Sequence, residues 1–377
     1  MLNLLSDITI LDFTQLLPGP YCSQLLADMG ARVIKVEQTG TGDYARLIPY
    51  LFNSVNRNKK SIKLNIKSQT GRDILEKLVK SADVFMEGAR PGVAERLKID
   101  YKRLSKINPG LIYCSISGYG QKGPYRNLPG HDLNYQAVSG MLSCFVDENE
   151  NSIHPKLPIA DMTAGLFATI GILTALHGKT NSSLGCYIDV SMLDGLLSFL
   201  SIPLGRYFHG INKTIYDPGY RIFKTSDDKY LTLGVYFEDW FWQRLCKTFK
   251  LPELSSLKAE ERKKRSPELI KILSDIFKTK PLEHWLEILT EADVPVSPVN
   301  SFKETVQDPQ VLCRKILDKN KEGGEPSIKG IMCPLNFSTG DYTSNPPPDL
   351  GQDTFDILLQ AGFSKDEIET FKKENII

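Results

Sequence analysis

Short apolar segments alternate with helical stretches through the first 115 residues, and this alternation constrains the fold more than any other feature of the chain. Strands are expected at residues 8–12, 31–36, 83–86 and 111–115, and helices at residues 20–29, 71–80 and 91–97. Gly30 ends the first of these helices. Strands that are separated by helices pair in parallel, so we expect an α/β fold with a Rossmann-like sheet.

The chain changes character near residue 200. Before this point we expect a buried helix at 160–177, a strand at 187–190 and a helix at 192–199. Beyond it come an irregular Gly/Pro/Tyr stretch at 207–220, a hairpin at 220–233 and lysine-rich amphipathic helices to Glu291. A low-order tract at 319–348 and a closing helix at 354–361 end the chain. This change predicts a smaller second domain after the first one.

The overall charge argues against a polyanionic partner. The formal net charge of the chain is +1 and its lysines are scattered, so we expect no nucleic-acid partner. The N-terminus lacks the basic start and apolar run of a signal peptide, and we find no run of about 18 apolar residues. We therefore expect a cytoplasmic protein without a membrane partner.

Known cofactor motifs are missing from the sequence. The close glycine pairs near strand ends, Gly40 with Gly42 and Gly118 with Gly120, form neither GxGxxG nor a P-loop. The sequence has no HExxH, CxxC pair or EF-hand pattern. We expect no metal and no dissociable cofactor.

His131 stands apart among the five histidines. It lies in a polar cluster, PGHDLNY at residues 129–135, directly before an apolar-periodic run at 137–145. This cluster is typical of a helix-entry loop with Asp132 as the cap, and it is also a candidate catalytic site. His154, His177, His209 and His284 have no comparable setting.

Asp161 marks the start of the expected buried helix, where a plain N-cap explains it. A carboxylate at a helix N-terminus is also favoured by the helix dipole, and nearby free N–H groups could bind a developing oxyanion. Both interpretations are compatible with thioester chemistry.

Two reactions fit these residues. Racemisation at the α-carbon of a thioester needs an acid/base group on each face, and His131 with Asp161 could supply both. Attack of a carboxylate on the thioester carbonyl needs one aspartate, for which Asp161 suffices.

Several segments, taken in order, resemble the family III CoA-transferases, which include formyl-CoA transferase, carnitine CoA-transferase and α-methylacyl-CoA racemase. They are LDFTQLLPGP (11–20), ADMGARVIKVE (27–37), NRNKKSIKLNIK (56–67), RPGVAERL (90–97), NP (108–109) through GYGQ (118–121), VSPVN (296–300), DPQ (308–310) and PPDLGQ (347–352). The resemblance spans nearly the whole chain.

The resemblance implies a particular domain organisation. A large CoA-binding, Rossmann-like domain at residues 1–200 is completed by residues 330–377, and a smaller α+β domain lies at 223–315 between linkers at 201–222 and 316–329. It also implies an interlocked homodimer.

The resemblance further implies an acyl-CoA substrate, so that coenzyme A enters as part of the substrate. The implied CoA-binding residues are Gln38, Leu64, Asn65, Ile66, Lys67, Gly88, Ala89, Arg90, Arg96, Gly130, Asp132, Asn134 and Tyr135. Lys67, Arg90 and Arg96 suit phosphate groups. Gln38 departs from the arginine that is usual there.

The resemblance places catalysis at three residues. Asp161 matches the aspartate that is the nucleophile in the transferases and an acid/base in the racemases, whereas His131 lies in a motif similar to that of the racemases. Glu238 resembles a carboxylate that assists the racemases. We therefore expect an α-methylacyl-CoA racemase-like enzyme, with a family III acyl-CoA:carboxylate CoA-transferase as the alternative.

Overall fold

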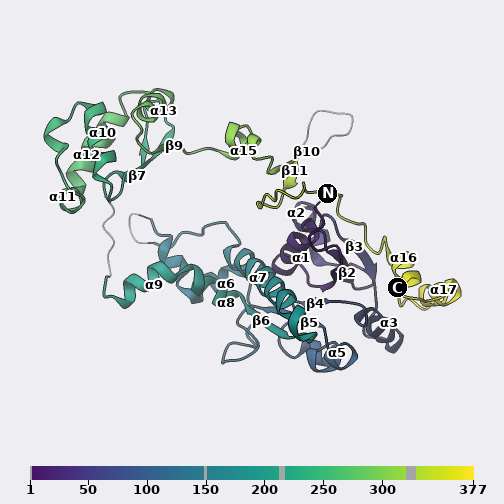
Figure 1. Cartoon of the computed structure of the whole chain (residues 1–377). Coiled ribbons are helices and arrows are strands. Elements are labelled where there is room, and N and C mark those ends of the chain that lie inside the picture. The colour runs from purple at the N-terminus through teal and green to yellow at the C-terminus, as the bar shows by residue number, and fades with distance from the viewer. Residues whose placement is uncertain (1, 148–150, 212–216, 320–327) are drawn as a thin grey trace. The chain divides into compact units, whose positions relative to one another are not determined.

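The computed structural model describes residues 2–147, 151–211, 217–319 and 328–377 (Figure 1). The chain divides into two compact units, a large one formed by Met1–Leu204 with Lys315–Ile377 and a small one formed by Gly205–Arg314. Parts of both predicted linkers, at 212–216 and 320–327, lie outside the described residues.

A six-stranded parallel sheet forms the centre of the large unit. Its strands are β1 (Thr9–Phe13), β2 (Arg32–Glu37), β3 (Lys60–Lys63), β4 (Val84–Glu87), β5 (Ile112–Ser117) and β6 (Tyr187–Ser191). They lie in the order β3-β2-β1-β4-β5-β6, and each neighbouring pair is parallel. The order reverses between β1 and β4, and in open α/β sheets ligands bind at the carboxyl ends of the strands at such a point.

The helices of the large unit before the small unit are α1 (Pro18–Asp28), η1 (Tyr44–Leu47), α2 (Pro49–Val55), α3 (Gln69–Val79), α4 (Val93–Leu97), α5 (Tyr101–Ile107), α6 (Asp132–Ser139), η2 (Met141–Cys144), α7 (Ile159–Ser182) and α8 (Met192–Phe199). Helix α9 (Ser201–Phe208) follows at the boundary between the units.

Both faces of the sheet are apolar, and successive strand residues point to opposite faces. On β1, Ile10 packs in the core with α1 and α7, whereas Leu11 packs in the core with α3. On β4, Val84 packs in the core with α1 and α7, and Phe85 packs in the core with α3. Burial on both faces explains why these strands are nearly continuous apolar runs.

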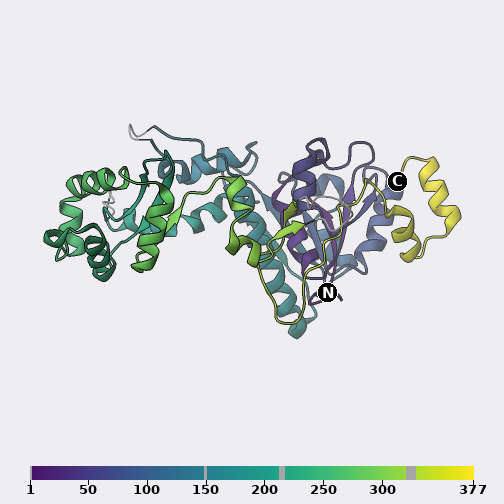
Figure 2. The same ribbon diagram turned by 90° about the horizontal axis from the view of Figure 1, so that it is seen from above.

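Helix α7 is a core helix of the large unit. Its segment 159–180 is long and apolar enough to cross a membrane by length and composition alone, but the helix packs on α1, α8, β5 and β6 (Figure 2). Gly165 permits the close approach to α1, since a Cβ there would lie 2.8 Å from the Pro18 carbonyl oxygen. The buried α7 residues Ala164, Ala168 and Ile172 belong to the core with α1.

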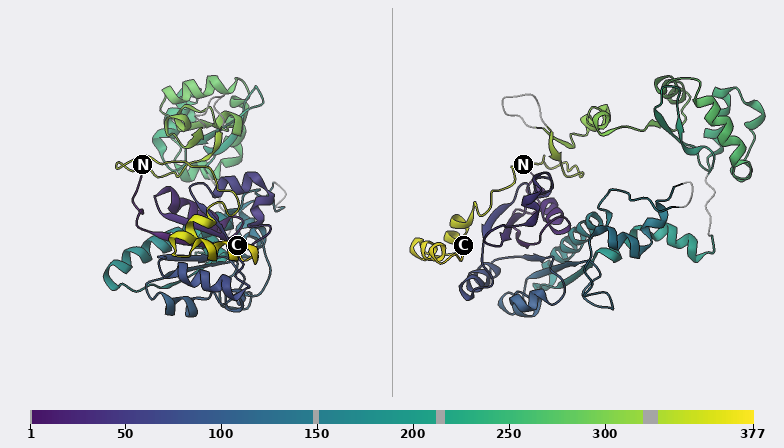
Figure 3. Two further views of the ribbon diagram at one scale, coloured as in Figure 1. Left: turned by 90° about the vertical axis from the view of Figure 1, so that its right-hand side faces the viewer. Right: turned by 180° about the vertical axis from the view of Figure 1, so that it is seen from behind.

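The C-terminal segment completes the large unit. It contains β10 (Leu317–Lys319), β11 (Ile328–Ile331), α16 (Thr354–Gln360) and α17 (Lys365–Lys373). The backbone N–H of Asn65 donates to the Ile376 carbonyl at 2.8 Å, and Ile357 and Ile368 join the core with α3. The yellow C-terminal helices accordingly lie beside the N-terminal part of the unit (Figure 3).

The small unit is built on an antiparallel sheet. Its elements are β7 (Tyr220–Lys224), β8 (Tyr230–Gly234), α10 (Asp239–Phe249), η3 (Pro252–Leu254), α11 (Ala259–Lys264), α12 (Ser266–Phe277), α13 (Leu282–Glu291), β9 (Val296–Pro298), α14 (Phe302–Thr305) and α15 (Pro309–Cys313). The strands lie in the order β7-β8-β9. Buried Arg262 donates from Nε to Asp217 at 2.6 Å and from Nη1 to Asp239 at 2.7 Å, which ties α11 to the segments before β7 and at α10.

The expected α/β class with a parallel sheet is confirmed, as is the antiparallel hairpin of the small unit. The helix that was expected to follow a cap at Asp132 begins one residue earlier, because Asp132 is the first residue of α6, and a 3-10 turn follows this helix. The sequence prediction also missed β3, α5 and α17.

Candidate functional site

A cleft opens at the carboxyl ends of β1, β4 and β5, where the strand order reverses. Its volume is about 200 Å³. The loops after β1 and β4, the segment 116–119 and the start of α6 line it, together with Arg126, Leu128, Asp161 and Met192. His131 and Asp161, the two residues singled out in the sequence, line this same cleft.

His131 lies at the N-cap position of α6, with an exposed side chain. Its backbone N–H donates to Asn134 Oδ1 at 2.9 Å, so a predicted CoA-binding residue is engaged in holding the histidine. The sequence prediction had assigned the cap to Asp132 instead. Asp132 is the first residue of the helix, and its carboxylate serves another helix.

Asp161 is the third residue of α7, where Pro158 holds the N-cap position. The prediction of a plain N-cap at Asp161 is therefore wrong by three residues. The side chain is half-buried, and its carboxylate accepts no hydrogen bond from any residue that the structure describes. The carboxylate is thus available to a substrate.

Asp132 connects α6 to the start of α7. Its Oδ1 accepts the backbone N–H of Ala160 at 2.7 Å and that of Asp161 at 3.2 Å. Its Oδ2 accepts the amide of Gln136, which also donates to the Leu157 carbonyl at 2.9 Å. The N–H groups expected to be free for an oxyanion are already bound, so that expectation is wrong for these two groups.

The same arrangement sets the charge state of Asp161. Burial raises its pKa, the negative charge of Asp132 raises it further, and the resulting pKa is about 7. A carboxyl with this pKa can both accept and release a proton near neutral pH. Perturbed carboxyls of this kind are concentrated at functional sites.

Tyr135 forms one wall of the cleft. Its hydroxyl donates to the Gly130 carbonyl at 2.8 Å, and burial raises its pKa to about 12. A Cβ at Gly118 would lie 2.3 Å from the ring, so the absence of a side chain there makes room for the tyrosine. Tyr119 packs against Tyr135 edge-on, with the ring centroids 5.0 Å apart.

The predicted CoA-binding residues fall into two groups. Those that line the cleft are Gly88, Ala89, Arg90, Gly130, Asp132 and Tyr135. Those outside its lining are Gln38, Leu64, Asn65, Ile66, Lys67, Arg96 and Asn134. Leu64 is buried in the core with α3, and its backbone N–H donates to the Glu37 carbonyl at 2.8 Å.

A buried ion-pair network supports the loop after β1. Lys35 Nζ lies 2.7 Å from Asp43 Oδ2 and also donates to the Thr14 carbonyl at 3.0 Å. Asp43 in turn accepts the N–H of Leu16 at 3.0 Å. This loop lines the cleft, yet its residues were absent from the predicted site. They could have been found from the sequence, because they belong to the segment LDFTQLLPGP (11–20) that resembles the family.

Glu238 belongs to the small unit, where it precedes α10 and accepts the N–H of Tyr236 at 3.3 Å. Its part in catalysis stays a prediction. Among residues 2–147, 151–211, 217–319 and 328–377, no cluster of three or more His, Cys, Asp or Glu side chains could hold a metal ion.

Comparisons with known proteins converge on one family. The model of CoA-transferase family III matches residues 5–354. Human succinyl-CoA:glutarate CoA-transferase is 35% identical over 95% of this chain and 86% of its own length, and human alpha-methylacyl-CoA racemase is 33% identical over 99% of this chain and 97% of its own length. The crystal structure of a CAIB/BAIF family protein from Brucella suis superimposes with a TM-score of 0.84 at 26% identity, covering 96% of this chain and all of that chain (100%).

Proposed function

The chain belongs to CoA-transferase family III, as the resemblance implied, and we propose that it racemises 2-methylacyl-CoA thioesters with His131 and Asp161 as the acid/base pair. Coenzyme A enters as part of the substrate, and the reaction needs no dissociable cofactor. We also propose that the enzyme acts in the cytoplasm.

The observation that carries this proposal is the meeting of His131 and Asp161 in one cleft. A 1,1-proton transfer requires one group to remove the α-proton and a second group to deliver a proton to the opposite face. The two side chains come from different helices, α6 and α7, whose N-terminal ends are linked through Asp132.

The charge state of Asp161 favours acid/base work. With a pKa of about 7, its carboxyl is divided between the ionised and protonated forms at neutral pH. The group can therefore remove the α-proton in one direction and supply it in the other. Efficient proton transfer needs a pKa close to the working pH.

The reaction is balanced without an oxidant or reductant. One residue takes the α-proton as the C–H bond breaks, the electron pair moves into the thioester to give an enolate, and the other residue donates a proton as the new C–H bond forms. The substrate and product differ in configuration alone.

The test is solvent exchange in D2O without any acceptor acid. The enzyme should place deuterium at the α-carbon of 2-methylacyl-CoA substrates and equilibrate the two epimers. Absence of exchange across several acyl chain lengths would contradict the proposal. Asp161→Asn supplies the inactive control, and Asp366→Asn, an exposed position on α17, supplies a matched active one.

A second candidate is acyl-CoA:carboxylate CoA transfer with Asp161 as the nucleophile. The similarity to transferases of glutarate and of oxalate, at 35% and 34% identity, favours it, as does the Asp161 carboxylate, which accepts no hydrogen bond from the described residues. In this reaction the carboxylate displaces the CoA thiolate to form a mixed anhydride. The thiolate then attacks the aspartyl carbonyl, which gives an enzyme–CoA thioester and releases the donor carboxylate. The acceptor carboxylate enters by the reverse of these two steps and leaves as its CoA thioester, which restores Asp161. Borohydride or hydroxylamine should then inactivate the enzyme after addition of acyl-CoA and not before it.

The predicted CoA-binding residues form part of the same proposal. We propose that Arg90, Arg96 and Lys67 bind the phosphates, since all three are exposed cations. Glu238 is proposed to assist catalysis, as the resemblance to the racemases implies. We further propose an interlocked homodimer, which is supported by exposed apolar side chains on α9: Ile202, Tyr207 and Phe208 are 76%, 68% and 75% exposed.

A further inference from the structure

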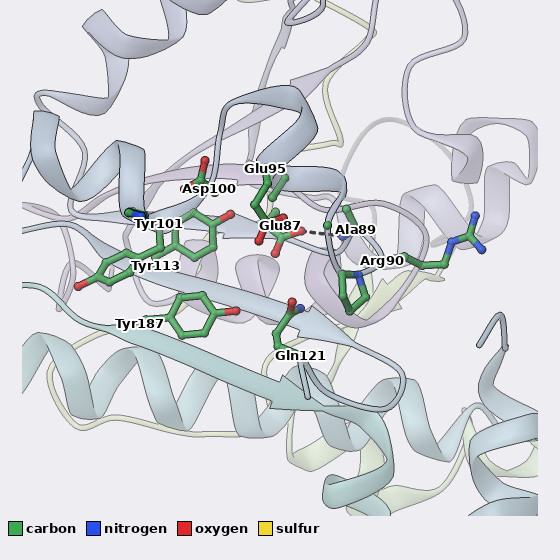
Figure 4. Close-up of a pocket in the computed structure, with 13 residues that line it drawn as sticks. Glu87, Ala89, Arg90, Glu95, Asp100, Tyr101, Tyr113, Gln121 and Tyr187 are labelled. Carbon is green, nitrogen blue, oxygen red and sulfur yellow. Dashed lines mark hydrogen bonds between the residues drawn. The ribbon is translucent and has the colours of Figure 1, made fainter. Parts of the chain in front are cut away.

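A second cavity lies behind the loop that follows β4. Its volume is about 250 Å³, and its walls come from β4, β5, β6, α4, α5 and Gln121 (Figure 4). Ala89, Arg90 and Pro91 line both this cavity and the catalytic cleft, so the loop separates the two. Neither His131 nor Asp161 lines the second cavity.

The hydroxyl of Tyr113 is the first sign that this cavity is built for a ligand. Tyr113 is 1% exposed, and its hydroxyl has no hydrogen-bond partner among the residues that the structure describes. Buried hydroxyl groups are nearly always paired, because leaving one unpaired costs free energy. A ligand in the cavity would supply the missing partner.

Glu87 lies close to this hydroxyl. Glu87 is 4% exposed, and its carboxyl accepts the backbone N–H of Ala89 at 2.8 Å, the bond drawn as a dashed line in Figure 4. Burial raises the pKa of Tyr113, and the charge of Glu87 raises it further. Glu87 and Tyr113 both line the cavity, and no hydrogen bond joins their side chains.

The remaining groups give the cavity an acceptor-rich and aromatic character. Glu95 and Asp100 add two carboxyls, and Tyr101 and Tyr187 add aromatic rings that pack within 6 Å of the Tyr113 ring. The basic residues of the lining, Arg90 and Lys102, are exposed, and the Arg90 guanidinium extends away from the tyrosines in Figure 4.

We propose that this cavity binds a small organic cation, a primary ammonium or a group of similar size, through Tyr113 and Glu87. Its N–H groups would donate to the Tyr113 hydroxyl oxygen and to the Glu87 carboxylate, and its alkyl part would pack on the tyrosine rings. The cavity, at about 250 Å³, has room for a small molecule of this kind. The two proposed ligand contacts, Tyr113 and Glu87, do not line the catalytic cleft.

Isothermal titration of the full-length protein with ethylammonium at pH 8 tests this site. This pH lies above the pKa of about 7 to which burial raises Glu87, so the carboxyl is ionised. We expect saturable binding of one ethylammonium per chain. Tyr113→Phe removes one oxygen and little volume, and it should weaken binding by about tenfold, as should Glu87→Gln.

Three controls make the result specific. Tyr50→Phe changes a tyrosine that is 79% exposed on α2, and it should bind like the wild type. Ethanol and acetate, which match the probe in size without its positive charge, should not bind. Circular dichroism of each variant separates lost binding from lost folding.

Two outcomes would overturn the proposal. One is the lack of saturable binding by ethylammonium and methylguanidinium alike. The other is binding that Tyr113→Phe and Glu87→Gln both leave unchanged, or that acetate matches.

Discussion

The carboxylate of Asp132 accepts the backbone N–H of Asp161 at 3.2 Å, so the residue that follows His131 caps the helix that carries the second candidate catalytic group. The same carboxylate raises the pKa of Asp161 through its charge. One side chain thus fixes both the relative placement of α6 and α7 and the charge state of the site.

Asp132→Asn should lower the pKa of Asp161. The amide oxygen can still accept the N–H groups of Ala160 and Asp161, but the negative charge that disfavours ionisation of Asp161 is gone. If ionised Asp161 is the base, the acidic limb of the pH profile of kcat/KM for α-proton exchange should move to lower pH. An unchanged limb, or one at higher pH, would contradict this role for Asp132.

Asp161→Asn should stabilise the fold at pH 8 while removing activity. The pKa of Asp161 rises from 3.8 to about 7 on folding, because burial and Asp132 disfavour its ionised form. The resulting destabilisation is absent below pH 4, grows between pH 4 and 7, and is complete above pH 7. Asparagine carries no charge and avoids this destabilisation, so the free energy of unfolding at pH 8 should rise by on the order of 2–4 kcal/mol.

Chemical denaturation of the wild type and Asp161→Asn at pH 4 and pH 8 measures this gain. Asp366→Asn controls for loss of a carboxylate at an exposed site. A gain of equal size at both pH values would show that ionisation of Asp161 is not its source.

His131→Gln should distinguish the two proposed reactions. A racemase needs an acid/base group on each face of the α-carbon, so deuterium exchange should fall by about 10²–10⁴-fold. If the enzyme is instead a transferase that relies on Asp161 alone, the same variant should transfer CoA more slowly but remain active. The matched control is His177→Gln, an exposed histidine near the end of α7. If His131→Gln lowered the rates of deuterium exchange and of CoA transfer equally, the variant would not distinguish a racemase from a transferase.

The exposed apolar side chains of α9 lead to a prediction about assembly. Light scattering should give twice the chain mass of 42.3 kDa, because a second copy would cover these side chains. Ile202→Lys with Phe208→Lys should shift the protein toward the monomer. Phe302→Lys, at a residue that is 91% exposed on α14, should leave the mass unchanged. A monomeric wild type at micromolar concentration would contradict the homodimer.

The parallel sheet was predictable because its strands are buried on both faces. Predicted strand 8–12 became Thr9–Phe13, and 31–36 became Arg32–Glu37, since continuous apolar runs mark such strands. Strand β3 escaped prediction because it has four residues, two of which are the lysines Lys60 and Lys63. Its place in the sheet comes from pairing with β2.

The sequence pointed to two residues that line the cleft, His131 and Asp161, but not to the contacts that hold them there. The polar cluster around His131 and the position of Asp161 drew attention to both residues. The contact of Asp132 with the start of α7 joins residues 28 and 29 positions apart, and it depends on how the two helices pack. Local sequence patterns carry no record of such a contact, so the cap was assigned to the wrong helix.

The large unit draws its core from both ends of the chain, which has a consequence for its synthesis on the ribosome. Ile357, Leu358 and Ile368 pack with Ile34 and Ile62 in one core. A nascent chain that has emerged only as far as the small unit therefore leaves that face of the sheet partly uncovered. The large unit should complete its folding after release of the finished chain, with the earlier-made sheet exposed to chaperones until then.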